Sequence, residues 1–118
     1  MDNAVKDQEK TLPPLVTVLM SVYNGEDFLA KAIESILGQT FKDFEFLIIN
    51  DGSRDKSSEI AGKFAQADRR IRLIEQDNKG LVAALNRGLE EARGTLIARI
   101  DADDIAYPNR LEKQVAHM

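Results

Sequence analysis

Asp101, Asp103 and Asp104 place three carboxylates within four residues, directly after an apolar run. Unpaired carboxylates at this spacing repel one another, and each resists ionisation. A divalent cation such as Mg²⁺ or Mn²⁺ removes the repulsion, because both ions prefer carboxylate oxygens and can share their coordination with phosphate oxygens. The spacing therefore indicates a metal–diphosphate site. The alternative is an acidic loop in which Asp104 caps the next helix.

Three other polar positions have side chains suited to a nucleotide. Asp51 follows an apolar run and precedes Gly52 and Ser53; it could accept hydrogen bonds from a base or a ribose, or simply belong to an ordinary turn. Tyr23 offers a face on which a base could stack, although a half-buried aromatic at a strand end would look the same. Lys79 precedes a helical pattern, where its charge and the helix dipole could attract an anion.

Apolar runs rich in β-branched residues alternate with segments of helical spacing, which defines the elements that must position these side chains. We expect strands at 15–22, 44–49, 71–74 and 95–100, and helices at 28–37, after Asp55, at 81–92, and from a first turn at Pro108. This alternation predicts an α/β fold, a Rossmann-like open and mainly parallel sheet with helices on both faces. Ligands bind at the carboxyl ends of such strands. The polar groups after the first, second and fourth strands should therefore meet at one rim, with the third strand nearer the sheet edge.

Composition excludes several classes of function. The 118 residues are 43% hydrophobic and 31% charged with a formal net charge of −4, which suits a globular domain and gives no basic field to recruit nucleic acid. The chain has no cysteine, which excludes a thiolate site within it, and its one histidine, His117, argues against a histidine-based metal site or catalytic triad built from this chain alone. No apolar run approaches the roughly 20 residues of a membrane helix. Residues 1–14 read as a disordered lead-in.

Taken together and in order, the motifs resemble those of the family 2 glycosyltransferases of GT-A fold, over about residues 15–115. Five segments carry the resemblance: 16–24, 35–45, 50–55 with Asn50 in place of the first acid of an Asp-Asp-Gly-Ser-x-Asp turn, 78–94, and the Asp-x-Asp region from Asp101 to Leu111. Each segment is weak alone and specific in combination.

The resemblance implies transfer of a sugar from a nucleoside diphosphate donor, often a UDP-sugar, to an acceptor hydroxyl with inversion at the anomeric carbon. Ser21 and Tyr23 would line the base pocket, and Asp51 would hydrogen-bond the uracil. Asp101 would approach the ribose, and Asp103 would hold Mn²⁺ or Mg²⁺ against the diphosphate. The family also implies a cytoplasmic location, with membrane association in a full-length protein.

An inverting transfer needs a general base, which in this family lies well downstream of the Asp-x-Asp region. We therefore expect the general base downstream of Met118, the last residue of the sequence. Residues 15–118 would then form a nucleotide-sugar-binding domain, truncated before the base and inactive alone. Residues 96–100 would form an exposed apolar edge through which the fragment self-associates.

Two rival interpretations stay open at the level of sequence. A phosphorylatable receiver domain fits the length and the alternating topology, but its acidic pair after the first strand is replaced here by residues 21–24, and its lysine after a fifth strand is missing. A non-catalytic nucleotide-binding module fits the same residues as the transferase.

Overall fold

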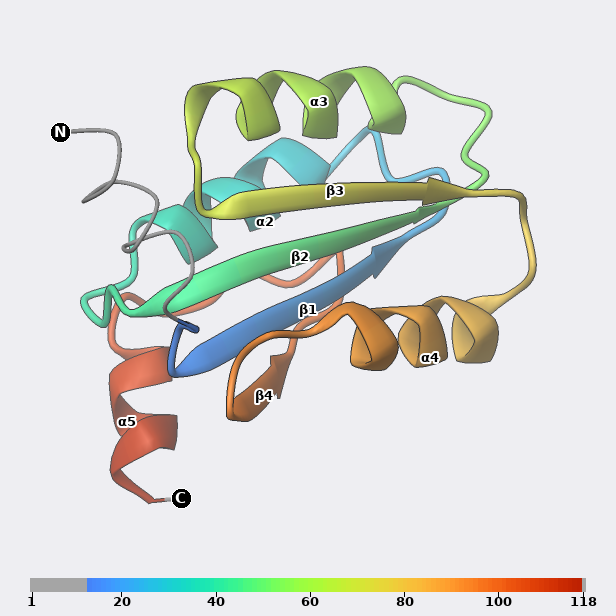
Figure 1. The fold of residues 1–118 in the computed structure, drawn as a ribbon. Coiled ribbons are helices and arrows are strands. Elements are labelled where there is room, and N and C mark those ends of the chain that lie inside the picture. Colours follow the sequence, from blue (N-terminus) through green and yellow to red (C-terminus); the bar gives the residue numbers. More distant parts are fainter. Residues whose placement is uncertain (1–12, 118) are drawn as a thin grey trace, which may run out of the picture.

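Four parallel strands form the centre of the fold in the computed structural model, which describes residues 13–117 (Figure 1). The order along the described chain is β1 (Val16–Val22), α2 (Leu29–Leu37), β2 (Phe44–Asp51), α3 (Ser57–Ala67), β3 (Ile71–Gln76), α4 (Leu81–Glu91), β4 (Leu96–Arg99) and α5 (Arg110–Ala116). The sheet order is β3-β2-β1-β4. The predicted α/β alternation, the parallel sheet and the edge position of the third strand are confirmed.

Helices cover both faces of the sheet, because alternate residues of the central strands point to opposite sides. Val18 and Met20 of β1 pack with Phe46 of β2 in the larger core, which α2, α3 and α5 close. Leu19 and Leu47 point to the other face, in a smaller core closed by α4. Both central strands are therefore almost wholly buried, which explains their continuous apolar, β-branched sequences.

Several boundaries differ from the predicted ones. β3 extends to Gln76, beyond the predicted end at 74, because its last residue pairs with Asp51 of β2. β4 is shorter than the predicted 95–100, and α4 ends at Glu91, one residue before the predicted end at 92, because Ala92 has an extended backbone.

The prediction that Pro108 occupies the first turn of the last helix is wrong, since α5 begins two residues later. The carbonyl oxygen of Pro108 accepts a hydrogen bond from the backbone N–H of Thr40 (2.8 Å). This bond fixes the proline in the segment that leads to the helix, rather than in the helix itself.

Two predictions concern the ends of the sequence. The predicted lead-in at 1–14 lies mostly outside the described residues. Met118 also lies outside them. The general base is expected downstream of Met118, beyond the last residue of the sequence, and it stays a prediction. Within residues 13–117, no helix has the length and apolar character needed to cross a membrane.

Candidate functional site

The carboxyl ends of three neighbouring strands bring the predicted site residues to one rim of the sheet. β1 lies between β2 and β4, so the end of β1 with Ser21 and Tyr23 separates Asp51 from the acidic loop that follows β4. Adjacent strands are about 4.8 Å apart. The rim therefore presents, in line, a buried carboxylate, a polar and aromatic strand end, and a cluster of exposed carboxylates.

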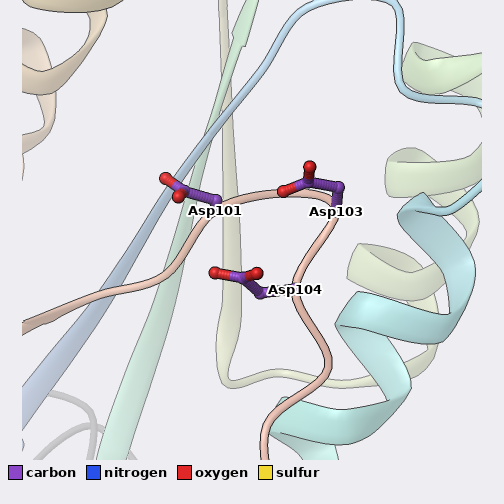
Figure 2. A group of neighbouring side chains, drawn as sticks. All are labelled: Asp101, Asp103 and Asp104. Atoms are coloured by element: carbon purple, nitrogen blue, oxygen red, sulfur yellow. The ribbon is translucent and has the colours of Figure 1, made fainter.

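The acidic loop gathers its carboxyl groups on one side (Figure 2). Asp101, Asp103 and Asp104 are exposed, and one carboxylate oxygen of each lies within 4.8 Å of the others. The loop bends back on itself, since the N–H of Asp104 donates to the carbonyl oxygen of Asp101 (3.0 Å). The alternative in which Asp104 caps the next helix is wrong, because α5 starts at Arg110.

This donor set fits a hard divalent cation. The ligands offered are carboxylate oxygens, which Mg²⁺ and Mn²⁺ prefer, and their exposure leaves room for phosphate oxygens as further ligands. Asp101 already has a cationic neighbour, because Nη2 of Arg99 lies 3.5 Å from its Oδ1. Among residues 13–117, Asp103 and Asp104 form no ion pair of this kind.

Asp51 occupies a different environment, with only 2% of its surface exposed. Its Oδ1 accepts hydrogen bonds from Nε2 of Gln76 (2.8 Å) and the N–H of Lys79 (2.9 Å), and its Oδ2 accepts from Nδ2 of Asn78 (3.3 Å) and the N–H of Gly80 (2.9 Å). Burial raises the pKa of Asp51, but the donors from Gln76, Lys79 and Gly80 outweigh it, so the pKa lies below its usual range. The carboxylate is thus ionised and holds the loop that leads into α4.

The sequence indicates Asp51 as a site residue but not the four groups that donate hydrogen bonds to its carboxylate. A base that hydrogen-bonds this carboxylate has to replace one of them, and the side-chain amides of Gln76 and Asn78 are the exchangeable pair. Asn78 lay within a motif already singled out, whereas Gln76 offered no signal beyond its position at a strand end.

The other predicted residues lie near these two groups. Ser21 is partly buried and pairs with Ile49 of β2, while Tyr23 just beyond the strand is 51% exposed. Lys79 is exposed beside Asp51. An open polar hollow at this corner is lined by Glu75, Gln76, Asp77, Lys79 and Arg87. Its mixed charges suit polar atoms of a ligand rather than an apolar one.

Two loops at the rim hold each other through reciprocal side-chain-to-backbone hydrogen bonds. Asn24, whose φ of 51° lies in the left-handed region that Asn tolerates, accepts from the N–H of Arg54 (2.8 Å) and donates its own N–H to Ser53 Oγ (2.9 Å). Further bonds join the same loops: Gly25 N–H to Ser57 Oγ, Glu26 N–H to Asp55 Oδ2, and Lys56 N–H to Glu26 Oε2. This loop pair fixes the backbone directly after Tyr23, and β1 fixes the backbone before it.

Asn50, the departure from the family turn, has a structural reason. It is 3% exposed, and its Nδ2 donates to Oε1 of Glu75 (2.8 Å), the residue directly opposite on β3. An aspartate at this position would face Glu75 with a like charge and no donor. Asn50 therefore fits its cross-strand neighbour.

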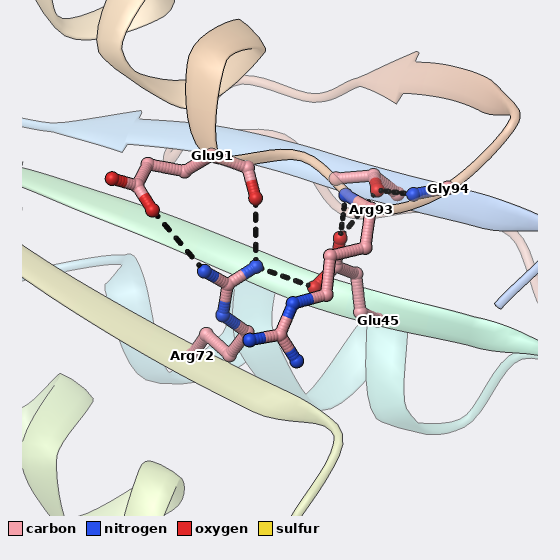
Figure 3. Close-up of polar contacts among 6 residues, drawn as sticks. Glu45, Arg72, Glu91, Arg93 and Gly94 are labelled. Atoms are coloured by element: carbon pink, nitrogen blue, oxygen red, sulfur yellow. Dashed lines mark hydrogen bonds and ion pairs between the residues drawn. The ribbon is translucent and has the colours of Figure 1, made fainter. Parts of the chain in front are cut away.

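A further polar cluster lies toward the amino ends of the strands, away from the rim (Figure 3). Glu45 accepts hydrogen bonds from Oγ1 of Thr17 (2.6 Å), the N–H of Arg93 (2.6 Å) and Nη1 of Arg72 (2.9 Å). The same Arg72 nitrogen donates to the carbonyl oxygen of Glu91 (2.8 Å). This cluster ties the end of α4 to three strands, and its place indicates stability rather than ligand binding.

Comparison with known proteins identifies the family. The family model described as glycosyl transferase family 2 matches residues 17–118, so the chain belongs to this family. Among its relatives is the uncharacterized glycosyltransferase EpsJ of Bacillus subtilis, which is 47% identical over 91 residues, or 77% of this chain and 26% of EpsJ. The chain spans between 26% and 38% of the length of three similar B. subtilis proteins.

Solved structures share the fold. Residues 1–349 of TarS of Staphylococcus aureus, solved in complex with UDP, superpose with a TM-score of 0.79 at 23% identity, over 86% of this chain and 31% of that TarS chain. The mannosyltransferase PcManGT of Pyrobaculum calidifontis, in complex with GDP-Man and Mn²⁺, gives 0.75 at 26% identity over 85% of this chain and 30% of PcManGT. The predicted GT-A, Rossmann-like fold is confirmed, and the family assignment displaces the receiver-domain alternative.

Proposed function

We propose that this chain forms the donor-binding part of a glycosyltransferase that transfers a sugar from a nucleoside diphosphate, with UDP as the expected nucleotide, to an acceptor hydroxyl with inversion. The observation that carries the proposal is the linear arrangement at the rim. Asp51, the end of β1 and the acidic loop follow one another across three adjacent strands. A nucleotide also has its base, ribose and diphosphate in linear order, so its base would lie at Asp51 and the end of β1, and its ribose and diphosphate at the acidic loop.

Each rim residue receives one role in this arrangement. Tyr23 and Ser21 line the base pocket, the base edge exchanges with a side-chain donor at Asp51, and Asp101 faces the ribose. The exposed Lys79 side chain attracts the negative charge of the nucleotide, whereas the amino end of α4 already faces the Asp51 carboxylate. Asp103 and its acidic neighbours hold Mn²⁺ or Mg²⁺, which when bound neutralises the charge that develops on the leaving nucleoside diphosphate.

Acceptor binding and general-base catalysis belong, in this proposal, to the additional length of the longer relatives, in the part that would follow Met118. A nucleotide-binding role is thus all that we assign to residues 15–118, and the non-catalytic-module interpretation describes the same role for this segment. We propose a cytoplasmic setting, at a membrane surface or away from it, on the resemblance to the family alone.

Calorimetric titration with UDP in Mn²⁺ and in EDTA tests the donor site, with ADP and GDP as competing nucleotides. We expect UDP to bind more tightly with Mn²⁺ than without it, and more tightly than ADP. Tighter binding of GDP would replace the assigned nucleotide, and absence of metal-dependent binding by the folded chain would contradict the proposed site.

Variants separate the two halves of the rim. Asp103→Asn should reduce the Mn²⁺-dependent gain in UDP affinity by about tenfold or more, as expected for perturbing a metal site, and leave binding in EDTA almost unchanged. Asp51→Ala should weaken binding in both conditions, because it releases the donors of the 76–80 segment. Asp43→Asn, the same charge change at an exposed site before β2, is the matched control.

Self-association through β4 is part of the same proposal. β4 pairs only with β1 among the described strands, and Leu96 and Ile97 on it are partly buried. An unpaired strand edge can accept a strand of another chain. We expect light scattering to show dimers whose fraction rises with concentration and falls in Ile97→Lys; a monomer at all concentrations would contradict this contact.

A further inference from the structure

The segment that follows the acidic loop is held by a buried glutamine from a distant part of the chain. Gln39 lies just beyond α2 and is 0% exposed. Its Nε2 donates to the carbonyl oxygens of Tyr107 (2.7 Å) and Ser35 (3.1 Å), and its Oε1 accepts from the N–H of Leu111 (2.9 Å). One buried amide thus bridges the end of α2, the approach to α5 and its first turn.

Two neighbours of Gln39 extend this attachment in both directions. Ser35 Oγ accepts the N–H of Ala106 (3.0 Å), and the N–H of Thr40 donates to the carbonyl oxygen of Pro108 (2.8 Å). We call Ser35, Gln39 and Thr40 the α2 anchor. It contacts the chain at intervals from Ala106 to α5, whereas Figure 1 shows the same segment running without a strand or helix of its own between β4 and α5.

The α2 anchor defines one end of the acidic loop, and β1 defines the other. The N–H of Ile100 donates to the carbonyl oxygen of Leu19 (3.0 Å), and Ile100 is buried at 3%. Residues 101–105, with all three aspartates, therefore span a short gap between two fixed points. Ala106, at the far point, is itself 6% exposed, so the attachment is inside the protein rather than on its surface.

A five-residue span fixed at both ends has few conformations, and one carboxylate oxygen of each of its three aspartates lies within 4.8 Å of the others. Releasing one end would let the carboxylates separate under their mutual repulsion. Residues that orient metal ligands from behind act in this way, and their loss weakens metal binding about 10- to 100-fold.

We propose that Gln39, with Ser35, is a positioning residue for the metal-binding carboxylates: it acts through the 106–111 segment to hold Asp103 and its neighbours in a binding geometry. The metal and the nucleotide in this inference rest on the proposed function. The anchoring of the 106–111 segment rests only on the hydrogen bonds of Gln39 and Ser35. Neither residue touches the donor itself. Their substitution should change the metal-dependent part of nucleotide binding and leave the metal-independent part intact.

The test uses Gln39→Met, which keeps the length of the side chain without its amide group, and Ser35→Ala, a smaller change. Ser35→Ala removes the bond that Ser35 Oγ accepts from the N–H of Ala106 and the bond that it donates to the carbonyl oxygen of Ala32 within α2. The matched control is Thr17→Val at the amino end of β1, where two hydrogen bonds are also lost, the buried one to Glu45 and the partly buried one from the N–H of Gly94. Thermal unfolding of all three gives the general loss of stability, and hydrogen exchange of the Asp104 and Ala106 amides reports the loop without any ligand.

We expect exchange at these two amides to accelerate in Gln39→Met and Ser35→Ala but not in Thr17→Val. The gain in UDP affinity from Mn²⁺ should fall about 10-fold in Gln39→Met and less in Ser35→Ala, while affinity in EDTA stays within about twofold. Unchanged exchange in both anchor variants, or an equal change in Thr17→Val, would overturn the proposal. So would an intact Mn²⁺ effect in a folded Gln39→Met protein.

Failure of the proposed function has a different signature. If the unsubstituted chain bound UDP equally in Mn²⁺ and EDTA, the donor site would be wrong, and Mn²⁺ alone, followed by the broadening of its electron paramagnetic resonance signal, would serve as the probe. Weaker broadening by Gln39→Met than by the unsubstituted chain, together with faster exchange at Asp104, would still support the anchor. Equal behaviour of the two proteins in both measurements would overturn it.

Discussion

Replacing Glu45 by Gln removes one negative charge from the buried cluster shown in Figure 3 and should destabilise the protein strongly. Glu45 is 7% exposed, and its carboxylate accepts from Thr17, Arg93 and Arg72. A glutamine keeps the shape but has one acceptor oxygen, so its NH₂ group must face at least one donor. Either the Arg72 guanidinium or the pair of donors at the other oxygen loses its acceptor.

The magnitude follows from these contacts. Breaking a buried ion pair by removing one partner costs about 3–5 kcal/mol. Arg72 is 26% exposed at its side chain and keeps its bond to the carbonyl oxygen of Glu91, so solvent and a second acceptor reduce the loss. We expect the free energy of unfolding to fall by about 2–3 kcal/mol, which corresponds to a lower Tm by roughly 8–15 °C for a chain of this size.

The change of this stability difference with pH is a second, independent test of the role of Glu45. Burial raises the pKa of Glu45, but the hydrogen bonds from Thr17, Arg72 and Arg93 lower it by more. The pKa of Glu45 therefore lies below its ordinary value of 4.5. A carboxyl group whose pKa is lowered by folding stabilises the protein above its unfolded pKa, and this contribution is lost as the pH falls through the folded value. The difference between the two proteins should therefore be largest near neutral pH and shrink below about pH 4.5.

Urea unfolding followed by circular dichroism, at several pH values from neutral to acidic, measures both effects. Glu91→Gln is the matched control, since its carboxylate is 37% exposed and 3.4 Å from Arg72; exposed pairs of this kind contribute about 0.2–1 kcal/mol. A loss in Glu45→Gln no larger than in Glu91→Gln, or a difference that does not change with pH, would refute the role given to the cluster.

Two further substitutions test the rim. Gly52→Ala should destabilise the protein by about 1–3 kcal/mol and weaken UDP binding in calorimetry. The reason is that φ at Gly52 is +72° and a Cβ there would lie 2.5 Å from the backbone nitrogen of Asn78. Unchanged stability together with unchanged UDP binding would contradict this steric argument. Asn50→Asp should cost about 1–3 kcal/mol in urea unfolding near neutral pH, through repulsion from Glu75. The loss of unfolding free energy in Asn50→Asp should become smaller at acidic pH, where the carboxyl groups are protonated. A loss that is constant with pH would show that altered packing, rather than charge repulsion, causes it.

The sequence predicted the sheet well because its local signals are strong. The runs in β1 and β2 are apolar and β-branched, and the helices carry one apolar face, so element types and order follow from patterning alone. The strand ends then place Asp51 and the acidic residues at one rim by the general rule for parallel sheets. The pattern thus predicts the local structure, and the rule for parallel sheets then predicts where the site residues lie.

Local patterning cannot show which polar groups meet across long separations. The carboxylate of Asp51 takes its donors from residues 76–80, and Gln39 binds backbone groups at 107 and 111. A buried glutamine between a helix and a strand has no periodic signal, and it reads as an ordinary loop residue. The boundary error at Pro108 has the same origin, since a contact with Thr40 decides it rather than the proline.

The two interlocked loops after β1 and β2 bear on how donor preference can be redesigned. Side chains of each loop satisfy backbone N–H groups of the other, as in the bonds of Asn24 with residues 53 and 54 and of Glu26 with Asp55 and Lys56. Grafting one loop from a relative would leave N–H groups of the resident loop without acceptors. Loops 23–28 and 52–57 are therefore a single module for exchange between family members, to be transplanted together or not at all.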